Sequence, residues 1–506
     1  MLRARMFPTL FVAYGLVAQT PAAVEPRPVS LQEAIAIALQ NNLQVQVARE
    51  TREGNQASVM TELGTFDWNL RSSFAWTRNQ DASRTQPIPG GAFVTSESTA
   101  WSRSFSVGAD KAFGWGGSLR LSYDPSYRFS KGSANGGPVV PFTTNPYDGA
   151  LSATYTQSLL RNFGRAAAES RLQVARKNAE IADFTFQRAI IDLVASIEAQ
   201  YWQVVYTKLN LENKKQSLEL AQKQLRENKI RVEVGTLAPI EITSAEASVA
   251  QREQEILAAE AEHLNAKDAL IRALFPTNER PGDLVPTDAP VTSATAPMDE
   301  KTAERMALDR RVELKAARLD YESRQIQERA AKNRTLPQLD AYATYTGNAA
   351  SQVAAEGLSA VNKDITSATY PGYTVGLQFS MPIQNRAAKG SLASARASLR
   401  ASELNLRDQE LGVLLEVRQA LRNLETAQKT VKAFEKTRIF REKNLEAEQK
   451  KFENGMSTNF FVLQRQDELD TAKAAELRGR IDFTKAITAL DKAVGTLLEA
   501  RKLDIK

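Results

Sequence analysis

The feature that constrains this chain most is a pair of very long stretches without proline, residues 165–233 and 388–454. Apolar residues recur three and four positions apart along both stretches, and charged residues fill the other faces. The stripe comprises Ala182, Phe186, Ala189, Leu193 and Ile197 in the first stretch and Leu414, Leu421, Leu424 and Val431 in the second. Since proline breaks a helix interior and this spacing puts the apolar residues on one seam, each stretch predicts a single coiled-coil helix. About 69 residues at 1.5 Å each make a helix roughly 100 Å long, which a compact globule does not need.

Each long stretch belongs to one copy of a repeated unit. Both copies read as a half-length helix, β-patterned segments, a long helix, a tight turn and another half-length helix; in the first copy the half helices are expected at residues 30–63 and 239–274. We assign residues 24–274 to the first copy and 301–506 to the second. Residues 275–300 hold five prolines, so we expect a linker with little helix or sheet.

The β segments alternate between apolar and polar residues. The expected apolar face comprises Phe66, Trp68, Leu70, Phe74 and Trp76 in the first copy, with Leu339, Ala341, Ala343, Tyr345, Tyr373, Val375, Leu377 and Phe379 in the second. Such a face meets lipid in a membrane β-barrel or a core in an ordinary sandwich, and the strands alone do not separate the two. The first copy carries further β pattern at residues 101–110 and 119–123, which predicts an extra hairpin either in the barrel or standing outside it.

Residues 1–23 read as a secretory signal. Arg3 and Arg5 form a positive start, residues 7–17 an apolar middle, and residues 18–23 a small-residue exit. The apolar run is too short for a membrane span, which takes about 20 residues, so we expect cleavage rather than anchoring. The export signal favours the barrel interpretation of the strands.

Composition removes several function classes. With no cysteine, the chain forms no disulfides and has no thiolate metal site or lipidated N-terminal cysteine. The formal charge of +6 is spread among acids rather than clustered, so we expect no nucleic-acid partner. His263 is the single histidine and lies among Glu260, Glu262 and Lys267 on a helix, which indicates a solvated residue. No catalytic constellation, metal cluster or cofactor motif stands out.

Several motifs, taken in order, resemble the TolC family of outer-membrane efflux proteins. They are Ser30 to Asn42 at the N-terminal opening, Gln157 to Arg165 and Phe379 to Ile383 at the two junctions between strand and long helix, and Gly455 with Ser457, Thr458 and Val462 to Gln464 at a helix turn. The resemblance covers nearly the whole chain after residue 23. It implies an α+β membrane protein: a homotrimer in which each protomer gives four strands to a twelve-strand outer-membrane β-barrel, continued into the periplasm by a coiled-coil α-barrel.

The resemblance also implies function and partners. Proteins of this family are passive exit ducts of tripartite efflux or type I secretion systems and use no cofactor. They pair with an inner-membrane pump or ABC transporter through a periplasmic adaptor, and their barrel contacts outer-membrane lipid. The expected adaptor-docking tip comprises Val234, Gly235, Thr236, Gly455, Met456 and Ser457.

The expected gate lies just beyond these turns and departs from the family pattern. Glu241 matches an acidic position in the first copy, but Phe461 and Gln464 stand where the second copy is expected to carry acids. Phe460 or Phe461 would form an apolar constriction, or would pack between helices instead. Two rival functions carry less support: a periplasmic coiled-coil adaptor or scaffold, which needs no lipid-facing strands, and an envelope hydrolase, which needs a catalytic set.

Overall fold

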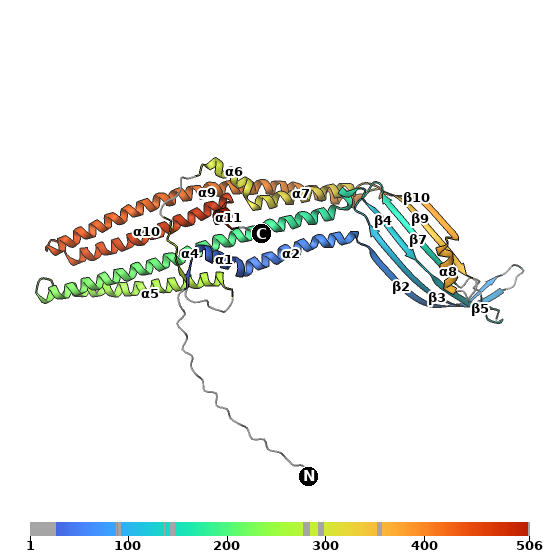
Figure 1. Ribbon diagram of the computed structural model, residues 1–506, viewed down its shortest axis with the longest axis horizontal. Helices are drawn as coiled ribbons and strands as arrows, with labels where there is room; N and C mark the ends of the chain where they lie inside the picture. The colour runs from blue at the N-terminus through green and yellow to red at the C-terminus, as the bar shows by residue number, and fades with distance from the viewer. Residues whose placement is uncertain are drawn as a thin grey trace, which may run out of the picture. The chain divides into compact units, whose positions relative to one another are not determined.

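The computed structural model describes residues 27–87, 89, 93–135, 137–141, 147–276, 284–291, 298–351 and 357–503 (Figure 1). The expected signal segment lies outside these residues. The chain divides into two compact units, which are described separately. The first unit comprises residues 1–46, 189–307 and 416–506, and the second comprises residues 47–188 and 308–415.

Helices make up much of the described chain, as the sequence predicts. They include α1 (Leu31–Asn41), α2 (Leu43–Leu63), α3 (Arg165–Ala168), α4 (Ser170–Glu233), α5 (Ile240–Leu274), α6 (Glu300–Arg310), α7 (Val312–Asn333), α9 (Arg386–Glu453), α10 (Asn459–Val494) and α11 (Leu497–Ala500). The expected long helices are confirmed as α4 and α9, with 64 and 68 residues. On α9 the buried stripe runs through Val413, Val417 and Ala420, one position away from the expected leucines.

The helical segment that begins each copy is broken once. For the first copy the sequence predicts an unbroken helix over residues 30–63 instead. The break lies at Asn42, directly after the 11 residues of α1, and at Arg311, directly after the 11 residues of α6. The backbone angle ψ is 124° at both residues. Asn42 caps the start of α2 and ties the break to α5: its Oδ1 accepts the Gln44 N–H at 2.9 Å, and its Nδ2 donates to the Ala273 carbonyl of α5 at 3.2 Å. A break at the same place in both copies is what a duplicated unit predicts.

The first unit also holds a small parallel sheet. Strand β1 (Arg27–Val29) pairs with β8 (Leu284–Pro286), so the expected linker is not free of strand. Tyr201 on α4 is fully buried behind this pair, and its hydroxyl lies 2.6 Å from Asp288 Oδ2 and 3.0 Å from the Val29 carbonyl. Burial and then the Asp288 carboxylate raise the pKa of Tyr201 to about 12, so the phenol keeps its proton as a donor at neutral pH.

A single antiparallel sheet fills much of the second unit. Its strands are β2 (Asn69–Pro87), β3 (Phe93–Ala112), β4 (Gly117–Tyr123), β5 (Ser126–Ala134), β6 (Val140–Pro141), β7 (Tyr147–Ser158), β9 (Gln338–Ser351) and β10 (Tyr370–Ser380). Strands β4 and β5 both pair with β3 in one continuous register, so they form one strand interrupted at Asp124 and Pro125. The main strand positions among the described residues are therefore six: β2, β3, β4 with β5, β7, β9 and β10 (Figure 1).

The cross-strand register puts the apolar residues of both copies on one face. Leu70 lies opposite Ala109, Ala109 opposite Leu121, and Leu121 opposite Ala153. The same face continues through β9 to Tyr373, Val375, Leu377 and Phe379 on β10. The other face is rich in hydroxyls and is tied by contacts such as Thr154 to Thr344 at 3.0 Å and Arg120 to Asp110 at 3.0 Å. We call these the apolar face and the polar face of the sheet.

The structure corrects two expectations about the strands. Phe66 and Trp68 do not belong to a strand. Phe66 lies in a 3₁₀ turn, Gly64–Phe66, because the helix α2 is not yet unwound there, and β2 begins at Asn69, one residue after Trp68. The expected four strands per chain are also too few. Residues 101–110 and 119–123 lie in β3 and β4 inside the sheet, between β2 and β7, so the extra hairpin is part of this sheet.

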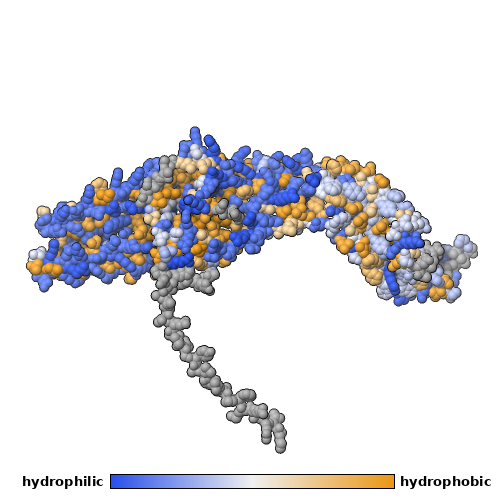
Figure 2. Space-filling view, in the orientation of Figure 1, coloured by the Kyte–Doolittle hydropathy of each residue, from blue (hydrophilic) through white to orange (hydrophobic). Residues whose placement is uncertain are grey.

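Most of the apolar face is exposed. The exposed fractions reach 84% for Val375, 76% for Tyr373 and 75% for Leu70. Figure 2 shows hydrophobic residues gathered over the strands, while hydrophilic residues predominate on the visible sides of α9 and α10. The one element packed on this face in the described sheet is α8 (Gly357–Thr366), whose Val361 and Ile365 contact Ala349. No helix within the described residues is long and apolar enough to cross a membrane.

Candidate functional site

The two helix turns expected at the tip share one hydrogen-bond pattern. Gly235 and Gly455 adopt φ of +77° and +73°, which glycine reaches without the strain that a Cβ introduces. After α4 the Gly235 N–H donates to Val232 and the Thr236 N–H to Arg231; after α9 the corresponding bonds run to Phe452 and Lys451. Both ends are Schellman caps, and the predicted structural role of the glycines is confirmed.

The next helices begin differently in the two copies. Pro239 is the N-cap of α5, where the sequence predicts that this half helix starts, and Thr458 is the N-cap of α10. The Ser457 hydroxyl donates instead to Glu448 Oε1, a contact that lowers the pKa of Glu448. The turn after α9 therefore has a side-chain hydrogen bond of its own.

Phe452 joins the two turns through its ring. It is 7% exposed and packs with Leu445, Val462 and Leu469, and Leu237 of the first turn lies against the same cluster. The guanidinium of Arg231, one turn before Gly235, lies 4.8 Å from the Phe452 ring centroid. The two turns thus contact each other within one protomer through an apolar cluster and a cation–π pair.

The expected gate residues lie on the surface of the protomer. Phe460 and Phe461 are 66% and 45% exposed and contact each other edge to face at 5.6 Å. The seam position beside them is taken by Val462, which is fully buried. Gln464 is exposed and donates to Glu468 at 3.4 Å, and Glu241 is half-buried at the start of α5. Packing between helices of the same protomer therefore does not account for the two phenylalanines.

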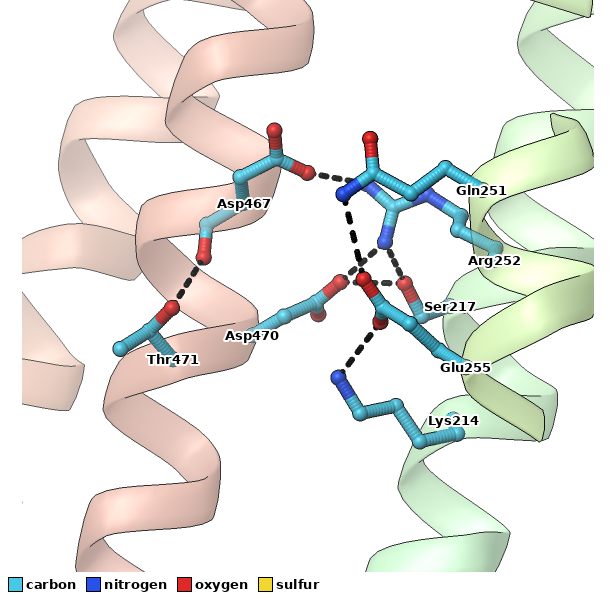
Figure 3. Close-up of polar contacts among 8 residues, drawn as sticks. All are labelled: Lys214, Ser217, Gln251, Arg252, Glu255, Asp467, Asp470 and Thr471. Carbon is cyan, nitrogen blue, oxygen red and sulfur yellow. Dashed lines mark hydrogen bonds and ion pairs between the residues drawn. The ribbon is translucent and has the colours of Figure 1, made fainter. Parts of the chain in front are cut away.

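Farther from the turns, an ion cluster around the buried Arg252 connects two helical hairpins, α4–α5 and α9–α10 (Figure 3). Arg252 on α5 has a side chain only 6% exposed and lies 2.6 Å from Asp470 and 2.8 Å from Asp467, both on α10. Ser217 on α4 bonds to both Arg252 and Asp470. Lys214 and Glu255 pair beside this cluster at 2.7 Å. We call Ser217, Arg252, Asp467 and Asp470 the polar tie.

A second set of buried polar residues lies nearer the turns. Gln224 donates to Asn228 at 3.0 Å and to Asn459 at 3.3 Å, and both asparagines are fully buried. Their Nδ2 atoms have no hydrogen-bond partner, and neither does Arg252 Nε. Buried polar atoms without partners are costly, so this interface is less stable than a well-packed apolar one of the same size.

Sequence reasoning missed the polar tie, although one signal was present. Arg252 lies seven residues from Ala245 and seven from Ala259, and all three are buried. A charged residue at a heptad core position is a candidate for a specific partner. The partner itself lies 218 residues away in the chain and is not indicated by local pattern.

His263 is less solvated than the sequence suggested. Its Nδ1 lies 3.0 Å from the Thr207 hydroxyl on α4. Burial first, and then Lys267 and Lys208, lower the pKa of His263, so the ring is neutral at pH 7. Within the described residues there is no group of three or more side chains suited to hold a metal ion.

Comparison with known proteins identifies the family. The model of the outer membrane efflux protein family matches residues 119–274 and 304–496, which is more than half of the chain. The chain belongs to this family. It is therefore a component of outer-membrane efflux, and the family is one of ducts rather than of enzymes.

Individual relatives agree with the family match. The outer membrane protein TolC of Vibrio cholerae is 24% identical over 336 residues, covering 66% of this chain and 74% of that protein. The outer membrane protein VceC of Vibrio cholerae is 16% identical with a TM-score of 0.64, covering 92% of this chain and 96% of that one. The CmeC outer membrane channel of Campylobacter jejuni is 12% identical with a TM-score of 0.65 over 99% and 98% of the two chains.

Proposed function

We propose that this efflux protein is a homotrimeric exit duct that inserts its sheet into the outer membrane and extends its helices into the periplasm. The observation that carries the proposal is the apolar face, on which Val375 and Leu70 are 84% and 75% exposed in a single protomer. A continuous exposed apolar face of this kind needs a lipid partner. The polar face, with its hydroxyl contacts, then lines a wet lumen.

The open edges of the sheet require other protomers. Among the described strands, β2 pairs only with β3 and β10 only with β9. Unpaired backbone groups are very costly in lipid, so the sheet closes only with copies of itself. Since the number of strand positions is even, β10 of one protomer runs antiparallel to β2 of the next, as closure by rotation requires.

Three such sheets make a barrel wider than the family pattern implies. Six positions in each of three protomers give eighteen strands rather than twelve. With strands about 4.8 Å apart and tilted about 40°, the backbone diameter rises from about 24 Å to about 35 Å. We therefore propose that the outer-membrane opening passes solutes larger than a twelve-strand barrel admits.

The proposal extends to partners, targeting and organisation. Residues 1–23 are a cleaved signal peptide, and the mature protein is not lipidated because it has no cysteine. The mature chain consists of two copies, 24–274 and 301–506, whose first helices break at the same place. A periplasmic adaptor docks at Val234, Gly235, Thr236, Gly455, Met456 and Ser457, and couples the duct to an inner-membrane pump or ABC transporter.

The gate proposal follows from the exposed phenylalanines. Around a three-fold axis, Phe460 and Phe461 of three protomers form an apolar constriction that blocks ions by dewetting. The acidic contribution comes from Glu241 alone, with Gln464 neutral. The polar tie holds the α4–α5 hairpin to α10 in the closed state. The unsatisfied Arg252 Nε in the tie, and the unsatisfied Nδ2 atoms of Asn228 and Asn459 nearer the turns, keep that contact breakable.

Mass measurement in mild detergent tests the assembly. We expect the purified protein to need detergent and to have three times the mass of one mature chain. Averaged electron-microscopic images of the barrel end are then expected to resolve eighteen strands. A stable monomer with intact secondary structure would contradict the trimer, and a twelve-strand barrel would contradict only the proposed width.

A further inference from the structure

Three cations lie on the apolar face of the sheet, toward the end at which β2 turns into β3. They are Arg78 on β2, Arg103 on β3 and Lys131 on β5. Arg78 lies directly opposite Trp101, and Lys131 lies opposite Thr99, two residues from Trp101 on the same face. Residues two apart on a strand share a face, so Arg103 is the neighbour of Trp101 on the other side. The three cations therefore surround one indole ring.

Contacts hold two of the cations against this ring. The Arg78 guanidinium carbon lies 5.8 Å from the Trp101 ring centroid, and Lys131 Nζ lies 5.2 Å from it. Phe129 supports the indole at 5.8 Å. A cation at this distance from an indole is attracted by the ring but keeps its charge free to bind an anion.

No acid neutralises these cations in the part of the chain that the structure describes. Two arginines of the polar face differ in this respect, since Arg71 and Arg120 both pair with Asp110. The acid on the same face of β3 is Glu97, which is the diagonal cross-strand neighbour of Lys131, about 7–8 Å away, and forms no ion pair with it. With three cations and this one acid, the cluster presents net positive charge at a surface that is otherwise apolar.

The cluster also marks the edge of the apolar band. Toward the helices the same face carries Leu70, Phe74 and Val107, and in the opposite direction it carries the polar Gln80 and Thr99. Membrane barrels bear a girdle of aromatic residues where their apolar band meets the lipid headgroups. Trp76, Trp101 and Tyr127 occupy this position, so the three cations lie at headgroup depth.

We propose that Arg78, Arg103, Lys131 and Trp101 form a binding site for the phosphate-bearing headgroup of an anionic lipid in the outer leaflet. The proposal rests on the proposed function, which puts the apolar face in lipid. Charge complementarity selects the ligand: basic residues at a membrane surface attract anionic headgroups, and the indole ring packs on the adjoining apolar part of the lipid. A trimer carries three copies of the site.

Lipid titration of the delipidated trimer tests the site, with native mass spectrometry as the readout. The probes are a bisphosphorylated glycolipid of the lipid A type and, for comparison, zwitterionic phosphatidylcholine. The test variant is Arg78→Gln with Arg103→Gln. The matched control is Arg84→Gln with Arg128→Gln, which removes two charges from β2 and β5 but from the polar face, where Arg84 lies opposite Ser96 and Arg128 opposite Ser102.

We expect the parent and the control to bind the phosphorylated lipid more tightly than phosphatidylcholine. Each cation removed weakens that binding by about fivefold, so the test variant loses about 25-fold, and Lys131→Gln a further fivefold. Equal binding of both lipids by the parent, or equal loss in the control, overturns the site. A trimer that inserts and conducts but shows no lipid preference refutes this inference alone, whereas a protein that does not insert refutes the proposed function first.

Discussion

Arg252 and Asp470 are joined at 2.6 Å although they belong to different copies of the repeated unit. The side chain of Arg252 is 6% exposed and that of Asp470 is 17% exposed, so the pair is held largely away from water. Asp467, the second acid beside Arg252, is 62% exposed and contributes less. The bond connects α5 to α10 and is the centre of the polar tie.

Removal of Arg252 is expected to loosen the contact between the hairpins. Arg252→Met leaves Asp470 buried without its cation, and breaking such a pair costs about 3–5 kcal/mol. We expect faster amide hydrogen exchange in α5 and α10 and a higher resting conductance. In the control, Arg252→Met combined with Asp470→Leu removes both charges and is expected to recover much of the protection. Unchanged exchange in the single variant would show that the tie does not hold the hairpins together.

The assignment of the two faces is tested on one strand. Val375→Arg puts a charge at the most exposed position of the apolar face and is expected to impair insertion by about 2–4 kcal/mol if it lies near the bilayer midplane. Thr374→Arg, the adjacent residue on the polar face, is expected to insert normally and to change ion selectivity. Trp68→Arg is expected to cost less than Val375→Arg, because Lys111 already lies 5.3 Å from the Trp68 ring at the edge of the band. Equal insertion of the two β10 variants would refute the assigned faces.

The gate prediction concerns the exposed phenylalanine pair. Phe461→Ser removes an apolar side chain from the constriction and is expected to raise resting conductance in planar bilayers. Phe461→Leu is the matched control, since it keeps the position apolar, and it is expected to stay closed. If Phe461→Ser conducts as the parent does, the side chain packs between protomers and does not form the barrier.

Glu241 is expected to affect selectivity rather than closure. Glu241→Gln removes the acidic side chain that we place at the entrance, so the preference for cations should fall while resting conductance stays near that of the parent. Reversal potentials in a salt gradient measure this preference. Opening of the pore by Glu241→Gln alone would mean that the gate is held by polar contacts and that Phe461 was assigned the wrong role.

His263 gives the α4–α5 hairpin a predictable pH dependence. Its pKa is lowered in the folded chain, chiefly by burial, so the folded state binds the proton less well than the unfolded state does. The contribution of His263 therefore leaves the free energy of unfolding undiminished above about pH 6.5, the ordinary pKa of histidine. That free energy falls as the pH drops below this value. We expect His263→Gln to reduce this loss in thermal melts between about pH 7.5 and pH 5. An unchanged pH profile would show that another group is responsible.

The sequence predicts the helices and their turns well because their causes are local. Absence of proline sets the length of α4 and α9, and the glycine caps at Gly235 and Gly455 depend on only a few neighbouring residues. Alternation likewise predicts the apolar faces of β2, β9 and β10. The features that the sequence did not predict have non-local causes. The place of β3 and β4 in the sheet depends on pairing with β2 and β7, and Arg252 meets an acid from the other copy.

Two further differences between the sequence prediction and the structure have local causes. Asn42 caps the second of two helices instead of continuing the first, because its side chain satisfies Gln44 N–H and the Ala273 carbonyl. Phe66 continues the alternating pattern in sequence but is still held in the turn that ends α2. Neither departure changes which residues of β2 lie on the apolar face.

Single-channel recording of the purified protein in a planar bilayer tests the central claim most directly. A passive duct is expected to insert without any cofactor and to give discrete conductance steps, small in the parent because the entrance is closed and larger in Phe461→Ser. The open steps should admit polyethylene glycols that a twelve-strand barrel excludes, since eighteen tilted strands raise the backbone diameter from about 24 Å to about 35 Å. Failure of the detergent-purified trimer to conduct, in the parent and in the gate variants alike, would contradict the account.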